Sequence, residues 1–160
     1  MATIPKIKIV DDSIIREEID DLYEVANQIV LAKWSLSIAK HILFVTGIDY
    51  KNIKVIEEGF QINERWQSKN ALVQDVRQAG FKIHKLAREN DNEIQKNALR
   101  VFGQAVSSGH MREHSMVASD YAIKVIGLLS ANDKSAISKE RKWQLEKLKN
   151  IISDCEKIIV

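Results

Sequence analysis

The sequence has very few residues that break or cross-link a chain: one proline, six glycines and one cysteine among 160 residues. All-β folds need turn residues about every eight to twelve positions, and so few breakers cannot supply them. The single cysteine, Cys155, can form neither an internal disulfide nor a multi-cysteine zinc site, which is typical of a reducing cytoplasm. We therefore expect an all-α, cytoplasmic protein.

Charge of one sign and long hydrophobic runs are also scarce. The 24 Lys and Arg residues against 22 Asp and Glu leave a formal net charge of +2, too small to indicate a protein that binds nucleic acid or a membrane surface. No apolar run approaches the roughly 20 residues that span a bilayer, and the first ten residues lack the unbroken apolar segment of a secretory signal. We expect no nucleic-acid partner and no membrane association.

Apolar residues make up 45% of the chain, enough to fill one core, and they recur at helical spacing. We expect an extended arm over residues 1–12 and a single helical domain over residues 13–160, a bundle of six to seven antiparallel helices. Residues 27–45 and 113–129 are apolar on several sides, which is typical of a central helix. An apolar seam along the last helix, which also suits a possible homodimer, consists of Leu145, Leu148, Ile152, Cys155 and Ile159.

The glycines fall into two groups. Gly47 and Gly109 lie at predicted helix ends, whereas the other four lie inside predicted helices. A glycine inside a helix costs roughly 1 kcal/mol relative to alanine. The expected compensation is close packing against a neighbouring helix at Gly59, Gly80, Gly103 and Gly127.

Enzyme signatures are missing: the chain has no Gly-rich phosphate loop, nucleophile elbow or paired-cysteine motif, so we predict no catalytic activity and no cofactor. Metal-ligand spacing occurs once, at His110 and His114, which share a face if both lie on a helix. Glu113 and Asp120 would add carboxylates. Gly109 argues that His110 lies in a loop or cap, and Arg112 would repel a cation. A metal-binding bundle or metalloenzyme is therefore the alternative hypothesis, with structural histidines as the simpler reading.

Two other features bear on partners. Residues 11–24 contain seven acidic residues and the lone basic residue Arg16. A solvated helix face explains such a run, but an acidic strip also steers a basic partner, and Asp20, Asp21 and Glu24 are the candidate contacts. The remaining histidines, His41 and His84, are isolated in the sequence and are expected to be structural.

One segment resembles a known family. Residues 98–110 read Ala-Leu-Arg-Val-Phe-Gly-Gln-Ala-Val-Ser-Ser-Gly-His and are followed by a second histidine, a tyrosine and a lysine. This is similar to A-x-R-A-x-G-Q-A-V-A-T-A-H-x-x-x-H-A-x-x-A-x-x-Y-A-x-K, a segment of small helical immunity proteins of bacterial polymorphic toxin systems. Residues 140–148 resemble the closing E-R-x-W-Q-L-x-x-L of that family.

The resemblance covers most of residues 25–150. It departs from the family where A-T-A-H reads Ser107, Ser108, Gly109 and His110. It implies a cytoplasmic protein that neutralises a cognate protein toxin by binding it, and it implies no catalytic residues. The positions that match the family signature are His110, His114, Tyr121, Lys124, Trp143 and Gln144.

Overall fold

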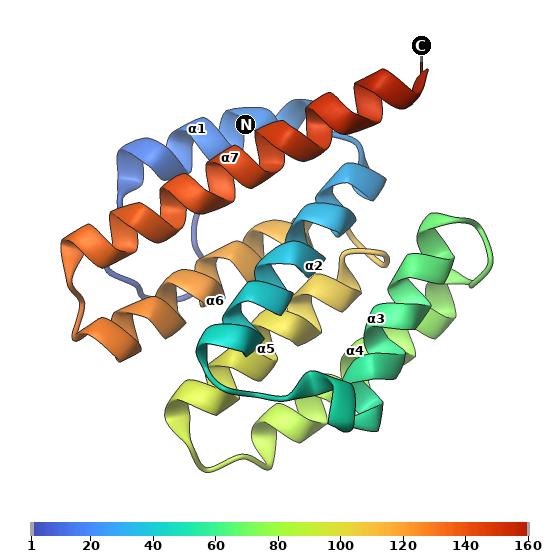
Figure 1. Ribbon diagram of the computed structural model, residues 1–160, viewed down its shortest axis with the longest axis horizontal. Coiled ribbons are helices and arrows are strands. Elements are labelled where there is room, and N and C mark those ends of the chain that lie inside the picture. The colour runs from blue at the N-terminus through green and yellow to red at the C-terminus, as the bar shows by residue number, and fades with distance from the viewer. Residues whose placement is uncertain (1, 160) are drawn as a thin grey trace.

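All regular structure within residues 2–159, which the computed structural model describes, is helical. The helices are α1 (Ser13–Val25), α2 (Gln28–Val45), α3 (Lys54–Gln67), α4 (Val73–Arg88), α5 (Glu93–Ser107), α6 (Glu113–Ser130) and α7 (Lys134–Ile159), with a short 3₁₀ helix, η1 (Tyr50–Asn52), before α3. No strand occurs within the described residues. The prediction of an all-α bundle is confirmed (Figure 1).

Polar side chains and one glycine set several helix ends. The side chains of Asp12 and Asn27 accept hydrogen bonds from the backbone N–H groups of Ile15 and Val30, at 3.2 and 2.9 Å. These N-caps satisfy N–H groups that have no partner inside the helix. Gly47, with φ of +72°, follows the end of α2 and adopts the left-handed conformation that glycine tolerates.

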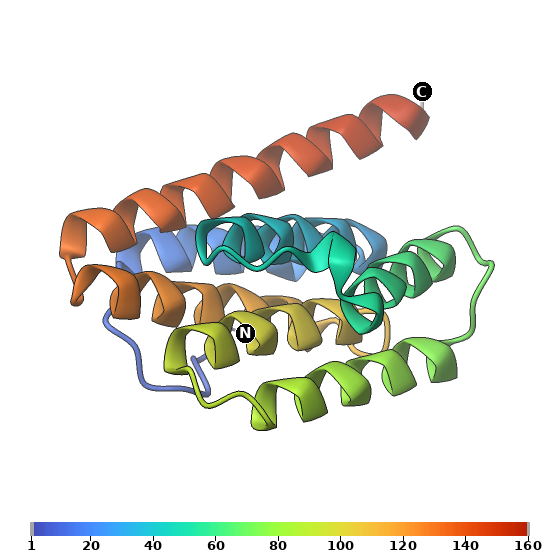
Figure 2. The same cartoon turned by 60° about the horizontal axis from the view of Figure 1, so that its bottom comes forward.

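The helices are arranged around α2, α5 and α6. α4, α5 and α6 lie side by side in chain order, and α2 packs across α5 and α6 (Figure 2). α1 and α7 lie next to each other (Figure 1), and α4 packs mainly against α3 and α5. The central positions predicted for residues 27–45 and 113–129 are those of α2 and α6, while the equally central α5 was not expected.

α2 is also long and apolar enough to cross a membrane, by length and composition alone. The expectation that no segment is long and apolar enough to span a bilayer is therefore wrong for α2. Most of its side chains between Val30 and Leu43 are buried, where α5, α6 and α7 pack on it. A central helix of a bundle meets the same criteria because it is apolar around most of its circumference.

Glycines inside helices mark close contacts between neighbours. A Cβ atom at Gly80 would lie 2.3 Å from Oγ of Ser107, and one at Gly103 would lie 2.6 Å from Cε1 of His84. Real Cβ atoms do not approach other atoms so closely, so these glycines let α4 and α5 come together. The predicted compensation for the helical glycines is confirmed at this interface.

A buried ion network surrounds Asp120 of α6. Its carboxylate accepts hydrogen bonds from Nε and Nη2 of Arg16, at 2.9 and 3.0 Å, and from Nη2 of Arg141 at 2.7 Å. Nε and Nη2 of Arg141 also donate to Asp11, both at 2.8 Å. Burial by itself would lower the pKa of Arg141, but the bonds to Asp11 and Asp120 raise it. The network joins the arm, α1, α6 and α7.

The N-terminal arm is held by the same region. The backbone N–H and hydroxyl of Thr3 donate to Asp20 at 2.8 and 2.6 Å, and Arg16 Nη1 donates to the Thr3 carbonyl at 3.0 Å. Exposure alternates along residues 2–10: the odd-numbered residues are half-buried and the even-numbered ones exposed. The arm therefore presents one side to the helices. It ends where α1 begins at Ser13, the first residue of the predicted helical domain.

Candidate functional site

α5 exposes only a narrow strip of side chains, because its neighbours cover the rest. Arg100 and Gln104 lie on this strip, four residues apart and therefore on the same side of the helix. α4 supplies His84 from one flank, α6 supplies His114 from the other, and the turn between α5 and α6 supplies His110. We call His84, Arg100, Gln104, His110 and His114 the His–Arg cluster.

The half-buried ring of His84 is positioned by two residues of α5. Arg100 Nη1 lies 3.0 Å from Nδ1 of His84, and Gly103 provides the space for the ring. A guanidinium can only donate, so Nδ1 of His84 accepts and Nε2 carries the hydrogen of the neutral ring. Burial, followed by the charges of Arg100, His114 and Arg88, lowers the pKa of His84 to about 4. His84 is therefore neutral at pH 7.

His114 has the opposite tautomer. Its Nδ1 lies 2.7 Å from Oε1 of Gln104, an oxygen that only accepts, so Nδ1 carries the hydrogen and the lone pair of Nε2 stays available. The His110 ring stacks near it, with centroids 5.9 Å apart and 29° between the planes. Burial, followed by the charges of His110 and Lys6, lowers the pKa of His114, and Glu113 acts in the opposite direction.

Arg100 differs from the two buried arginines, Arg16 and Arg141, which are paired with aspartates. Within residues 2–159 Arg100 has no carboxylate partner, and its hydrogen bond goes to the neutral ring of His84. The cluster thus combines one permanent cation with N–H donors and one free imidazole lone pair. All five residues are half-exposed, so solvent reaches the cluster.

Three of the six signature positions lie on α6, and His110 lies in the turn before it. Tyr121 lies about two turns after His114 along α6, and Lys124 lies nearly three turns after it. All three side chains are half-buried. At about 100° per residue, Tyr121 therefore lies on nearly the same side of α6 as His114, whereas Lys124 lies about 80° around the helix from it.

The other two signature residues lie elsewhere and support the packing of α7. The ring of Trp143 stacks on His41, with centroids 4.3 Å apart. Gln144 is buried, and its side-chain amide donates to the backbone carbonyl of Ser119 at 3.1 Å. The backbone carbonyl of Gln144 accepts from Nε1 of Trp34 at 2.9 Å. Leu145 and Leu148 of the predicted seam are likewise buried within the chain.

The proposed ligand set for a metal is not assembled. Asp120 lies six residues after His114, which puts it roughly 120° around a helix of about 3.6 residues per turn, and its carboxylate is bound by Arg16 and Arg141 instead. Glu113 is exposed. Within the described part of the chain, no three His, Cys, Asp or Glu side chains are grouped so as to hold a metal ion.

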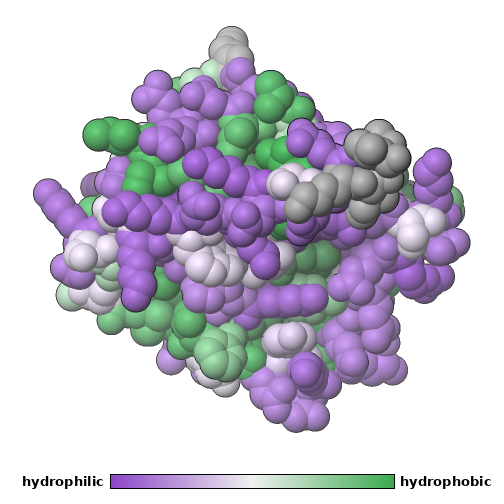
Figure 3. All heavy atoms as spheres, turned by 45° about the horizontal axis from the view of Figure 1, so that its top comes forward, coloured by the Kyte–Doolittle hydropathy of each residue, from purple (hydrophilic) through white to green (hydrophobic). Residues whose placement is uncertain are grey.

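The acidic segment is divided between interior and surface. Asp20 is buried and binds Thr3, so its predicted place among surface contacts is wrong: its side of α1 faces the arm. Asp21 and Glu24 are exposed, as are Glu17 and Glu18. The side of the molecule formed by α1 and α7 is largely hydrophilic, with separate apolar patches (Figure 3).

Arg112 connects the end of α1 to the turn that carries His110. Its guanidinium donates to the carbonyls of Tyr23 and Ala26, the latter at 3.0 Å, and lies 4.6 Å from the centroid of the Tyr23 ring. Arg112 is thus directed toward α1. Because of this contact, the exposed residues at the end of α1 lie beside the α5–α6 turn.

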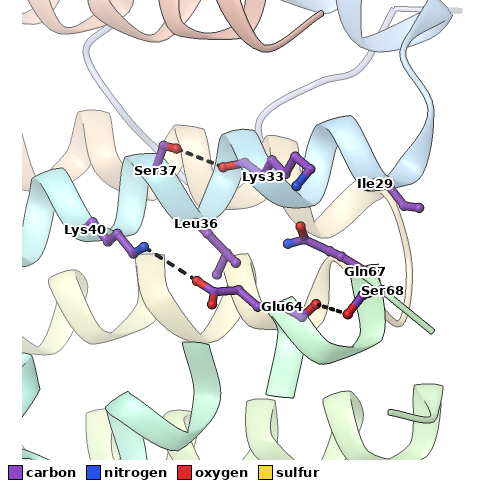
Figure 4. A pocket seen from close by; sticks show the side chains of 8 residues that line it. All are labelled: Ile29, Lys33, Leu36, Ser37, Lys40, Glu64, Gln67 and Ser68. Carbon is purple, nitrogen blue, oxygen red and sulfur yellow. Dashed lines mark hydrogen bonds and ion pairs between the residues drawn. The ribbon is translucent and has the colours of Figure 1, made fainter. Parts of the chain in front are cut away.

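A separate groove runs between α2 and α3 (Figure 4). Lys40 from α2 and Glu64 from α3 form an ion pair across it, with 3.6 Å between the charged atoms. Leu36 and Ile29 add apolar surface to its wall. None of the residues of the His–Arg cluster contributes to this groove, and its paired charges give no sign of a specific ligand.

His84 is the functional candidate that sequence reasoning missed. It is 16 residues from Arg100 and 30 from His114, so no local spacing connects the three side chains. The available signal was Gly103, a glycine inside a helix, which indicates that something packs closely there. The sequence does not show which side chain occupies that space.

Comparison with known proteins gives a match to a protein family. Residues 21–151 match the family model described as Imm-5 like putative immunity protein, in agreement with the resemblance noted in the sequence. No curated protein and no solved structure matches the chain.

Proposed function

Because the chain belongs to the Imm-5 like immunity protein family, we propose that it neutralises a cognate toxin by binding it directly, without catalysis. The observation that carries this proposal is that four of the six signature residues are polar or ionisable side chains left partly exposed at the surface. His110, His114, Tyr121 and Lys124 are all half-exposed, and the first two belong to the same cluster as Arg100. Polar side chains in such a place are available to a partner.

We place the docking surface on three adjoining parts: the end of α1, the α5–α6 turn and the His–Arg cluster. Val25, at the end of α1, is 81% exposed and Met111, in the turn, is 48% exposed. Protein interfaces commonly combine such apolar contacts with arginine and polar groups. Arg112 holds the first two parts together, so a partner meets a preorganised surface and little ordering is required on binding.

The exposed carboxylates of α1 contribute to this surface through long-range attraction. Glu17, Glu18, Asp21 and Glu24 all lie on the exposed side of α1. A basic toxin, such as a nuclease, is steered by such charges, which raise the association rate more than they lengthen the life of the complex.

The direct test uses the toxin encoded beside the gene for this chain. Co-expression is expected to restore growth and to yield a stoichiometric complex on size-exclusion chromatography with light scattering. Titration of active toxin with purified protein separates binding from catalysis. Neutralisation by binding stops when the protein is saturated, whereas an enzyme inactivates an excess of toxin. Growth rescue without a complex, or inactivation of many equivalents, contradicts the proposal.

A further inference from the structure

We propose that the His–Arg cluster is a binding site for an oxyanion, the carboxylate or phosphate group of a partner. The inference concerns the isolated chain; only the source of the oxyanion in a complex rests on the proposed function. It starts from Arg100, whose guanidinium carries five N–H donors in a planar fork. One of them is directed to the neutral ring of His84.

The unpaired state of Arg100 is the first argument. A charge that is partly removed from water without a counter-charge is unfavourable, and the chain pairs its buried arginines, Arg16 and Arg141, with aspartates. At Arg100 the counter-charge is missing within residues 2–159. A bidentate oxyanion supplies that charge and uses the geometry of the fork.

The surroundings of Arg100 are the second argument, because they favour an anion over a cation. The charged and titratable groups that act on the two rings are Arg88 from α4, Arg100 from α5, His110 from the turn, Glu113 from α6 and Lys6 from the arm. Glu113 is the single acid among them. A metal cation is repelled by this set of charges, whereas an anion is attracted.

The tautomers supply the third argument. His84 accepts from Arg100, so its Nε2–H is a donor. Nδ1 of His114 is committed to Gln104, and its Nε2 becomes a donor when it takes up a proton. An anion next to the ring favours the protonated form, so binding of an oxyanion is coupled to proton uptake by His114. Affinity is therefore expected to rise as the pH falls from 8 to 6.

Sulfate is the appropriate probe, because its charge does not change over this pH range. We would follow the imidazole signals of the protein by NMR during titration with sodium sulfate, at an ionic strength kept constant with sodium chloride. Saturable shifts are expected at His84 and His114, with tighter binding at pH 6 than at pH 8. Shifts that grow linearly, or that chloride produces equally, overturn the inference.

Variants locate the site. Arg100→Gln is expected to weaken sulfate binding about tenfold or more, because the charge-assisted bonds are lost. Arg65→Gln is the matched control: it removes the same charge from an exposed arginine of α3, and the affinity should not change. His114→Gln serves as a second variant in case Arg100→Gln does not fold, and it should abolish the dependence of affinity on pH. Equal affinity in all four proteins overturns the inference.

The toxin complex then identifies the source of the oxyanion. If a carboxylate of the toxin occupies the site, sulfate competes with the toxin at constant ionic strength and Arg100→Gln weakens the complex; this is the result we expect. Simultaneous binding of sulfate and toxin assigns the site to a small oxyanion instead. If the protein binds the toxin but not sulfate, the oxyanion site is overturned and the proposed function stands. If it binds sulfate but not the toxin, the oxyanion site stands and the proposed function is overturned.

Discussion

Arg141 and Asp120 meet at 2.7 Å in the interior, with side chains that are 0% and 3% exposed. Asp120 is also the partner of Arg16, so one carboxylate balances two buried guanidinium groups with help from Asp11. Removal of one member of such a network leaves an uncompensated charge away from water, which is more costly than the loss of a surface ion pair.

We therefore expect Asp120→Asn to lower the free energy of unfolding by about 3–5 kcal/mol. Urea denaturation followed by circular dichroism measures this. Asp21→Asn is the control, because Asp21 is exposed on α1, and its effect should stay within about 0.5 kcal/mol. Equal stabilities of the two variants would show that the network does not hold the arm and helices together.

The contact between His84 and Gly103 gives a second prediction. Gly103→Ala places a methyl group 2.6 Å from Cε1 of His84, so the ring must move, at a cost of about 1–3 kcal/mol. In a His84→Ala background the same substitution meets no ring and should cost less. A double-mutant cycle on unfolding free energies measures the difference; a coupling energy of zero contradicts the close contact.

Stability should depend on pH through the cluster. The pKa of His84 is lowered to about 4 in the folded state from an unfolded value near 6.5, so the unfolded chain binds more protons as the pH falls. The contribution of neutral His84 to the free energy of unfolding is therefore complete above about pH 6.5 and is lost progressively as the pH falls toward about 4. Between pH 7 and pH 5 we expect a loss of about 1–2 kcal/mol once screening by solvent is allowed for.

The control for this pH effect is His84→Gln, measured by urea denaturation at both pH values. This variant should lose part of the change in unfolding free energy between pH 7 and pH 5. The rest of that change should disappear in His84→Gln/His114→Gln, because the pKa of His114 is lowered as well. The pKa of Asp12 is lowered, chiefly by its bond to Ser138, so its contribution falls away only at more acidic pH. An unchanged slope in the double variant assigns the effect to other groups.

The acidic residues of α1 should separate into two kinds. Asp20→Lys puts a cation where Thr3 binds and is expected to destabilise the fold by about 2 kcal/mol or more. Asp21→Lys/Glu24→Lys changes exposed positions. With a basic toxin it should associate more slowly at low salt, a difference that disappears at high salt.

Stopped-flow association with the purified toxin measures the steering effect. Asp49→Lys/Asp91→Lys changes the net charge equally, at exposed positions in the loops after α2 and α4, and should alter the rate less. Equal rates for the two double variants would show that attraction depends on net charge rather than on α1.

Features that depend on residues close together in the sequence could be predicted from the spacing of residue types. The all-α class, the start of α1 at Ser13, the central positions of α2 and α6 and the close contacts at helical glycines all follow from periodicity, caps and breakers. The motif in residues 98–124 identified the family. Periodicity works for these features because a helix places residues three and four apart on one side, whatever packs against it.

The identity of the groups that meet across helices depended on the packed bundle. The side chains of Asp20, Asp21 and Asp120 are chemically identical. Asp120 nevertheless binds buried arginines, Asp20 binds Thr3 of the arm, and Asp21 is exposed. His84 and Arg100 are brought together by α4 lying against α5. Contacts between residues far apart in sequence set which side of each helix is covered and by which neighbouring helix. These contacts therefore decided which charges are neutralised in the interior. They also left Arg100 without a carboxylate partner among the described residues, and we propose that it binds an anion instead.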